Sequence, residues 1–117
     1  MKSDNVVQIK SYDFALRIIK VYKYLSQEKK EFVLSKQLLR SGTSIGANIE
    51  ESIGGQSKPD FFAKITIAYK ETRESKYWIR LLRDSEYLTN EQSEDLLKDV
   101  EELLKIIGSI QKTVRNS

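Results

Sequence analysis

The 117-residue sequence predicts an all-α protein, an antiparallel up-down-up-down four-helix bundle that forms a single domain over residues 1–117. Three observations support this fold class. Apolar residues recur at steps of three and four in four separate segments, as on the buried face of a helix. The chain contains only five Gly and one Pro, so turn formers are scarce. The connections between the segments are short, which favours antiparallel neighbours. The expected helices cover residues 11–29, 33–53, 59–87 and 90–114.

The first expected helix has one apolar face and a polar residue suited to its start. Ser11 is the predicted N-cap, because its hydroxyl can accept a hydrogen bond from the free backbone N–H groups of the first turn. The apolar side chains follow at steps of four, three and four, and they are Phe14, Ile18, Val21 and Leu25. We therefore expect the chain to enter the bundle at Ser11.

The second expected helix contains a run of small residues from Ser41 to Ala47, which are poor helix formers. Either the helix breaks here, or the small residues let another backbone come close, as small-xxx-small faces do in membrane helices. Gly42 and Gly46 would form such a face. Its core line consists of Leu34, Leu38, Ser41, Ile45 and either Asn48 or Ile49.

The third and fourth expected helices each have a clear start. Pro59 suits the first turn of the third helix, and Thr89 with Gln92 matches a capping box before the fourth. The third core line is Phe61, Ile65, Ala68, Thr72, Ser75, Ile79 and Leu82. The fourth is a heptad seam of Leu96, Val100, Leu103, Ile107, Ile110 and Val114.

The composition excludes several classes of enzyme. The chain has neither cysteine nor histidine, which removes zinc fingers, Cys–His and Ser–His–Asp hydrolases and most transition-metal sites. The segment from Gly42 to Gly46 matches the G-x-S-x-G nucleophile elbow, but an elbow needs a preceding strand and a histidine base. Carboxylates on several helices could in principle form an all-carboxylate metal site, but ion pairs that fix helix register are the simpler interpretation. We expect no catalytic activity, cofactor or metal.

Hydropathy predicts a cytoplasmic protein that does not cross a membrane. No targeting segment is visible, and the longest apolar runs are three residues, as in Phe14-Ala15-Leu16.

The charges are distributed unevenly. Residues 84–102 contain eight acids and one lysine, a net charge of −7. Because the whole chain has a net charge of +3, the remaining residues together carry +10. Such a division is typical of an acidic solvated face combined with a basic surface that attracts an anion. It is equally consistent with a role in solubility alone.

The third expected helix carries two candidate surfaces. Ile67, Trp78 and Leu81 point away from its core line and suggest an interface between subunits. The alternative is a wide core-facing arc with Trp78 half exposed. Between the two faces lie residues suited to phosphate contact and base stacking, or equally to a solvated helix flank. They are Lys70, Arg73, Tyr77 and Arg80.

The second expected helix carries a motif, L-x-x-Q-x-x-R-S-x-x-S-x-x-x-N-I-x-E, that resembles the bacterial 23S rRNA intervening-sequence protein family, or "four helix bundle protein". Its residues are Leu34, Gln37, Arg40, Ser41, Ser44, Asn48, Ile49 and Glu51. Phe61, Ile67-Ala68 and Glu74 add to the likeness, which extends from Tyr12 to Ile110. Glu50 and Ser52 depart from the family's usual N-I-A-E-G ending, which bears on the geometry of the helix end.

The resemblance implies a four-helix bundle that assembles into a ring-like homopentamer without catalytic activity. A related bundle protein is an accessory factor of diversity-generating retroelements, in which a basic pentamer binds nucleic acid and reverse transcriptase. The polar motif residues are expected to be structural, because a buried charge persists only when it is paired. Arg40 would pair with Glu51 or Glu74, and Asn48 would satisfy groups nearby.

The leading hypothesis is a non-enzymatic, oligomeric four-helix bundle that binds structured RNA or DNA through phosphate contacts. The alternative is a structural scaffold that binds a protein partner and no nucleic acid, in which the basic surface serves solubility only.

Overall fold

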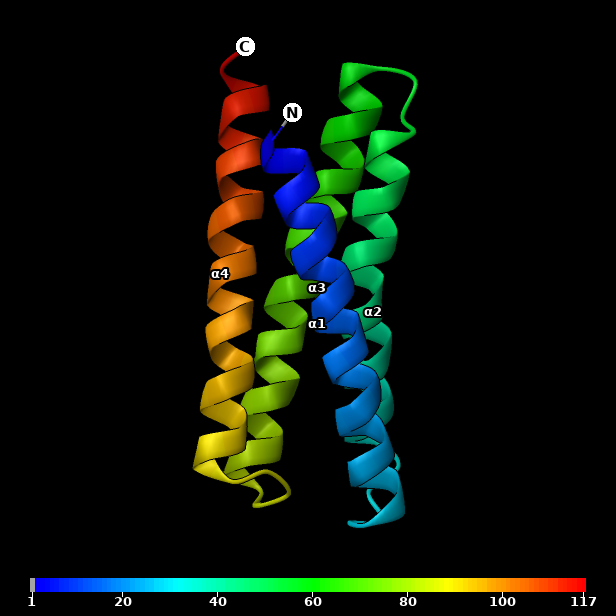
Figure 1. Cartoon of the computed structure of the whole chain (residues 1–117), viewed down its shortest axis with the longest axis vertical. Coiled ribbons are helices and arrows are strands. Elements are labelled where there is room, and N and C mark those ends of the chain that lie inside the picture. Colours follow the sequence, from blue (N-terminus) through cyan, green and yellow to red (C-terminus); the bar gives the residue numbers. More distant parts are fainter. Residues whose placement is uncertain (1) are drawn as a thin grey trace.

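Four long helices form an elongated bundle of 46 × 21 × 19 Å. The structure is a computed structural model that describes residues 2–117, with side chains from Val6 onwards. The helices are α1 (Lys2–Gln27), α2 (Leu34–Ile53), α3 (Lys58–Asp84) and α4 (Asn90–Arg115). Successive helices run in opposite directions (Figure 1), and the described residues contain no strand. The predicted all-α four-helix bundle is confirmed.

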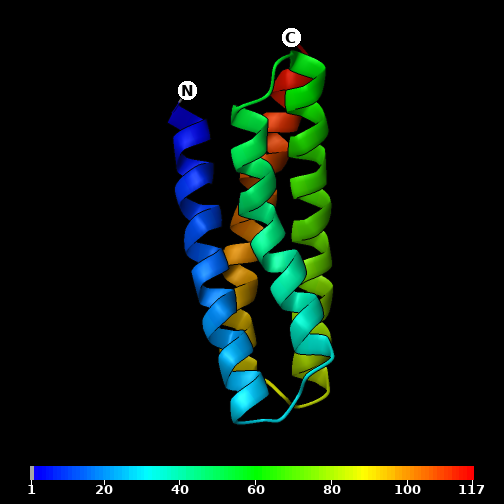
Figure 2. The same cartoon turned by 90° about the vertical axis from the view of Figure 1, so that its right-hand side faces the viewer.

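The helices occupy the four corners of the bundle in chain order. Helix α2 packs on both α1 and α3, and α4 packs on α3 and, less extensively, on α1. Helices α1 and α3 are not direct neighbours and therefore occupy opposite corners. Figure 2 shows them at opposite edges of the bundle, with α2 between them. The outer surfaces of α1 and α3 consequently face in different directions.

The core lies along the bundle axis, where the predicted apolar lines meet. Val21, Phe61 and Val114 are half-buried at its edges. Leu34, the first residue of α2, is also half-buried against the core. The fully buried core residues from the four predicted lines are Phe14, Ile18, Leu25, Leu38, Ile45, Ile49, Ile65, Ala68, Ile79, Leu82, Leu96, Val100, Leu103, Ile107 and Ile110. Burial of these side chains from all four helices holds the bundle together.

The small residues of α2 serve close packing, and the helix does not break at them. A Cβ atom on Gly42 would lie 2.8 Å from Cγ1 of Ile18 on α1, and one on Gly46 would lie 3.4 Å from the backbone oxygen of Ser11. At Gly42 the close approach of α2 to α1 therefore depends on the absence of a side chain, whereas a Cβ on Gly46 would just reach van der Waals contact. On the other side of α2, the buried Ser75 Oγ donates to Ser41 Oγ at 2.9 Å.

The predicted start of the first helix is wrong. Helix α1 begins at Lys2, and Ser11 lies in its third turn, 1% exposed. The Ser11 hydroxyl donates to the backbone oxygen of Gln8 at 3.2 Å, so it is satisfied within the helix. A small residue is required there because Gly46 of α2 crosses directly beside it.

The other helix ends follow the sequence more closely. Thr89 and Gln92 form the predicted capping box, with hydrogen bonds of 2.9 and 3.0 Å to each other's backbone N–H groups. Ser57 caps α3, and Pro59 lies in the first turn. Helix α3 ends at Asp84, three residues before the expected position, and Glu86 then adopts a left-handed φ of 69° in the turn.

Candidate nucleic-acid interface

The candidate phosphate-binding residues form one line on the outer surface of α3. They follow at steps of three, four and three, and all are exposed: Lys70, Arg73, Tyr77 and Arg80. The line is outward because α3 buries Ile65, Ala68 and Ile79 on the opposite side. We call these four residues the α3 basic line. The Tyr77 ring is 53% exposed and contacts the Trp78 ring edge-on, with centroids 5.1 Å apart.

In the part of the chain described with side chains, some cations on the bundle walls are held in ion pairs, whereas those of the α3 basic line are not. Within residues 6–117, Lys70, Arg73 and Arg80 have no carboxylate within 4.0 Å. Six other cations form ion pairs and are Lys10, Arg17, Arg40, Lys64, Lys76 and Arg83. An unpaired, exposed cation can contact an anionic ligand without first breaking an internal ion pair.

A carboxylate lies near the end of this line. The pKa of Asp84 is lowered, chiefly by its hydrogen bond from Arg83, which outweighs the opposite effect of burial. The charges of Arg83 and Arg80 lower it further. Arg80 is therefore near enough to Asp84 for its charge to act on that carboxylate.

Much of the negative charge of the acidic stretch is offset by ion pairs. On α4, Asp95 and Asp99 both pair with Arg17 of α1, and the distance from Arg17 Nη2 to Asp95 Oδ2 is 2.9 Å. Glu102 pairs with Lys10 of α1 at 2.9 Å. Glu101 pairs with Lys76 of α3 at 2.6 Å, and Asp84 pairs with Arg83. Five of the eight acids thus form ion pairs, four of which connect α4 to its neighbours.

The polar motif residues connect α2 to α3. Arg40 lies between two glutamates, donating to Glu71 Oε2 at 3.1 Å and to Glu74. The Trp78 indole N–H donates to the same Glu74 carboxylate at 3.0 Å. The Arg40 side chain is 49% exposed, so the expectation that it is buried is wrong. The reason is that its guanidinium spans the outer rim of the α2–α3 contact.

The remaining motif residues have separate partners. Glu51 forms an ion pair with Lys64 at 3.3 Å and does not contact Arg40. Asn48 donates to the backbone oxygen of Ser44 at 2.8 Å, one turn earlier in its own helix. Arg40 and Glu51 therefore connect α2 to α3, as Ser41 does through Ser75, whereas Asn48 makes a local contact.

The predicted subunit interface on α3 is only partly exposed. Ile67 is 38% exposed, whereas Trp78 packs half-buried against the bundle core and Leu81 is also half-buried. At Trp78 the geometry fits the alternative of a wide core-facing arc. We call Ile67, Trp78 and Leu81 the α3 face; its role as an interface stays a prediction.

A larger apolar surface lies on α1, and the sequence reasoning missed it. Ile9, Tyr12, Leu16 and Ile19 expose 62%, 64%, 45% and 37% of their surfaces. We call these four residues the α1 face. Their spacing of three, four and three was visible in the sequence as a second apolar stripe beside the core line.

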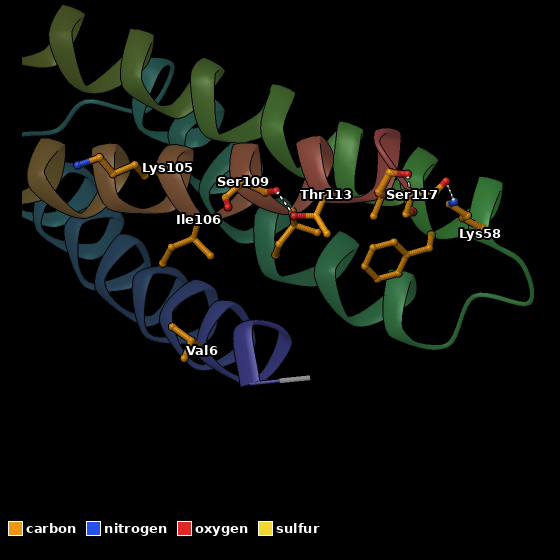
Figure 3. A pocket seen from close by; sticks show the side chains of 10 residues that line it. Val6, Lys58, Lys105, Ile106, Ser109, Thr113 and Ser117 are labelled. Atoms are coloured by element: carbon orange, nitrogen blue, oxygen red, sulfur yellow. Dashed lines mark hydrogen bonds between the residues drawn. The ribbon is translucent and has the colours of Figure 1, made fainter.

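An apolar groove opens between the first turns of α1 and the ends of α3 and α4 (Figure 3). It encloses about 770 Å³ and is lined chiefly by Val6, Phe61, Ile106, Ile110 and Val114. The hydroxyls of Thr113 and Ser117 on its wall donate to backbone oxygens of α4, and the Lys58 ammonium of α3 donates to the backbone oxygen of Ser117 at 2.7 Å. Such side chains do not form a nucleophile with an adjacent base.

Two further findings concern the part of the chain that the structure describes. Its carboxylates form no group of three or more that could hold a metal ion. None of its helices has an apolar stretch long enough to cross a lipid bilayer.

Together the fold and its outer surfaces define a small all-α four-helix-bundle protein with a line of unpaired cations on one helix. A family model described as 23S rRNA-intervening sequence protein matches residues 3–109. The chain therefore belongs to this family, as the motif in α2 indicated.

A solved structure agrees with this membership. A protein of unknown function from the S23 ribosomal protein family of Bacteroides thetaiotaomicron shares 54% sequence identity, with a TM-score of 0.93. The match covers 94% of this chain and 98% of the other. No curated protein matches the chain.

Proposed function

We propose that this protein is a non-enzymatic, cytoplasmic homo-oligomer that binds structured RNA or DNA through the α3 basic line. The observation that carries the proposal is the unpaired state of Lys70, Arg73 and Arg80 in a single exposed row. The family's description refers to 23S rRNA intervening sequences, and this connection with RNA supports the choice of ligand.

The arrangement suits contact with a phosphate backbone. Three cations at helical spacing cover about 15 Å along α3, at a rise of about 1.5 Å per residue. Each phosphate that they neutralise releases condensed counterions, so the binding depends strongly on salt and little on sequence. Tyr77 adds an exposed aromatic ring on which an unpaired base can stack.

Oligomerisation would strengthen contacts that are weak individually. If Ile67 and its neighbours on the α3 face contribute to an interface, the basic line is repeated in every subunit. Several weak sites that engage one ligand bind with a much higher overall affinity than one site. The family resemblance sets the expected number of subunits at five.

The test is a double substitution, Arg73→Gln with Arg80→Gln, measured by fluorescence anisotropy with a labelled RNA and a labelled DNA. We expect weaker binding and a slope of log K against log salt that is flatter by about one unit per lost phosphate contact. The control is Lys36→Gln with Lys112→Gln, which removes the same charge from exposed positions on α2 and α4. Equal losses from both variants would indicate an effect of net charge and contradict the site.

A further inference from the structure

The α1 face has no partner within the bundle. Helix α1 already buries Val7, Phe14, Ile18 and Leu25 on its inner side. A helix in an isolated bundle needs only one apolar stripe. Four large side chains in a second stripe form a patch on the order of a few hundred Å², which is the size of surface that marks interaction sites on monomers.

The spacing of the α1 face matches the surface of another helix. Steps of three, four and three place side chains on one line, as at a helix–helix seam. Ile9 and Ile19 are ten residues apart, so the line extends about 15 Å. The occupant that this pattern fits best is therefore a helix with its own exposed apolar residues.

The same chain offers such a helix on its opposite side. Helix α3 carries the α3 face, of which Ile67 is 38% exposed. Helices α1 and α3 occupy opposite corners and run in the same direction (Figures 1 and 2). Rotation of a second copy about an axis parallel to the bundle would bring its α3 alongside α1 of the first copy.

The charges beside the Ile19 end of the α1 face are complementary to those on α3, whereas the carboxylates of Asp13 and Glu50 border its Ile9 end. Lys20 and Lys23 border the α1 face, are exposed, and form no ion pair with any residue from 6 to 117. Glu71 and Glu74 lie between Ile67 and Trp78 along α3 and share a single cation, Arg40. The three charges of that cluster sum to −1, so a lysine from a neighbouring subunit would balance it.

We propose that the α1 face of one copy packs against the α3 face of the next, so that the subunits associate head to tail. This inference rests on the proposed homo-oligomer and assigns the α1 face and the α3 face as the two surfaces of its subunit contact. A two-fold contact of α1 with itself would leave the α3 face uncovered, whereas the head-to-tail contact covers both. Because the two faces differ, the contact is heterologous and every subunit uses each face once.

The test uses two variants that each block one face, Leu16→Lys on α1 and Ile67→Glu on α3, examined by light scattering. Each variant alone should have the mass of a monomer, 13.6 kDa. An equimolar mixture should form a dimer and nothing larger, because each mixed pair retains a single intact junction. Val33→Lys is the matched control, since Val33 is apolar, 71% exposed and outside both faces; this variant should keep the mass of the wild type.

Each contrary result has a distinct meaning. A wild-type chain that is monomeric at micromolar concentration would overturn the proposed homo-oligomer itself. An oligomeric wild type with an oligomeric Leu16→Lys variant would overturn the role of α1 alone. Monomeric variants whose mixture forms no dimer would overturn the head-to-tail pairing. Circular dichroism shows whether each variant is folded, and Tyr12→Lys blocks the α1 face independently if Leu16→Lys is not.

Discussion

Two hydrogen bonds connect Glu31 and Ser35 at the start of α2. The Glu31 carboxylate accepts the Ser35 backbone N–H at 2.7 Å, and the Ser35 hydroxyl donates to the Glu31 backbone oxygen at 2.7 Å. The same carboxylate accepts the N–H groups of Val33 and Leu34 at 3.1 and 3.0 Å. Glu31 therefore satisfies three N–H groups at the start of a helix whose N-cap residue, Val33, makes no side-chain hydrogen bond.

This cap predicts a dependence of stability on pH. Burial acts to raise the pKa of Glu31, but hydrogen bonds from the three backbone N–H groups and the Ser35 hydroxyl outweigh it and lower the pKa below its ordinary value of 4.5. A lowered pKa in the folded state stabilises the fold at pH values above 4.5. The contribution is lost as the pH falls below 4.5 and through the folded-state pKa.

Glu31→Gln should therefore destabilise the protein at pH 7 by about 1–3 kcal/mol, because the hydrogen bonds lose their charged acceptor. The difference from the wild type should shrink towards pH 3. Urea unfolding at both pH values measures it. Glu28→Gln is the control, because Glu28 is exposed and only three residues away; an equal loss from that variant would contradict the cap.

Gly42→Ala should destabilise the fold by about 1–3 kcal/mol, the range for overpacked cores. Its Cβ would lie 2.8 Å from a carbon of Ile18, which is itself buried, so α1 would have to move. Gly108→Ala is the matched control, since its Cβ would meet only the Tyr69 ring at 3.5 Å. That variant should gain about 0.5–1 kcal/mol from helix propensity. Thermal unfolding of both variants checks the sign of each effect.

Arg40→Met should cost about 1 kcal/mol. A buried pair would cost about 3–5 kcal/mol when one partner is removed, but Arg40 is 49% exposed and Glu74 is 37% exposed, so only the Glu71 carboxylate, 16% exposed, is left largely buried without its cation. Chemical unfolding, compared with Lys64→Met at the neighbouring Lys64–Glu51 pair, measures the difference. A loss of several kcal/mol from Arg40→Met alone would show that the Glu71–Glu74 cluster depends on this cation.

The helices could be predicted from the sequence because burial follows their periodicity. The heptad seam of α4 and the capping box at Thr89 are local patterns, and both form as predicted. The start of α1 was not predictable in the same way. Ser11 has the chemistry of a cap, and only the crossing of Gly46 on a different helix explains a small buried residue at that position.

The candidate site was predictable only in part. The exposure of the α3 basic line follows from its position opposite the core line. The exposure of Arg40 does not, because it depends on how far α2 and α3 are separated at their rim. The spacing of the α1 face is present in the sequence. Its exposure could not be predicted, because that requires knowing which side of α1 packs against the core.

The central claim is that unpaired cations on this bundle bind nucleic acid, and a salt series with the wild-type protein tests it most directly. Anisotropy of a labelled RNA and a labelled DNA should show binding at about 50 mM salt, where electrostatic attraction is strong. The affinity should fall linearly on a log–log plot as salt increases to about 200 mM. Absence of binding to both ligands at about 50 mM salt would contradict the claim and favour a scaffold that binds a protein partner.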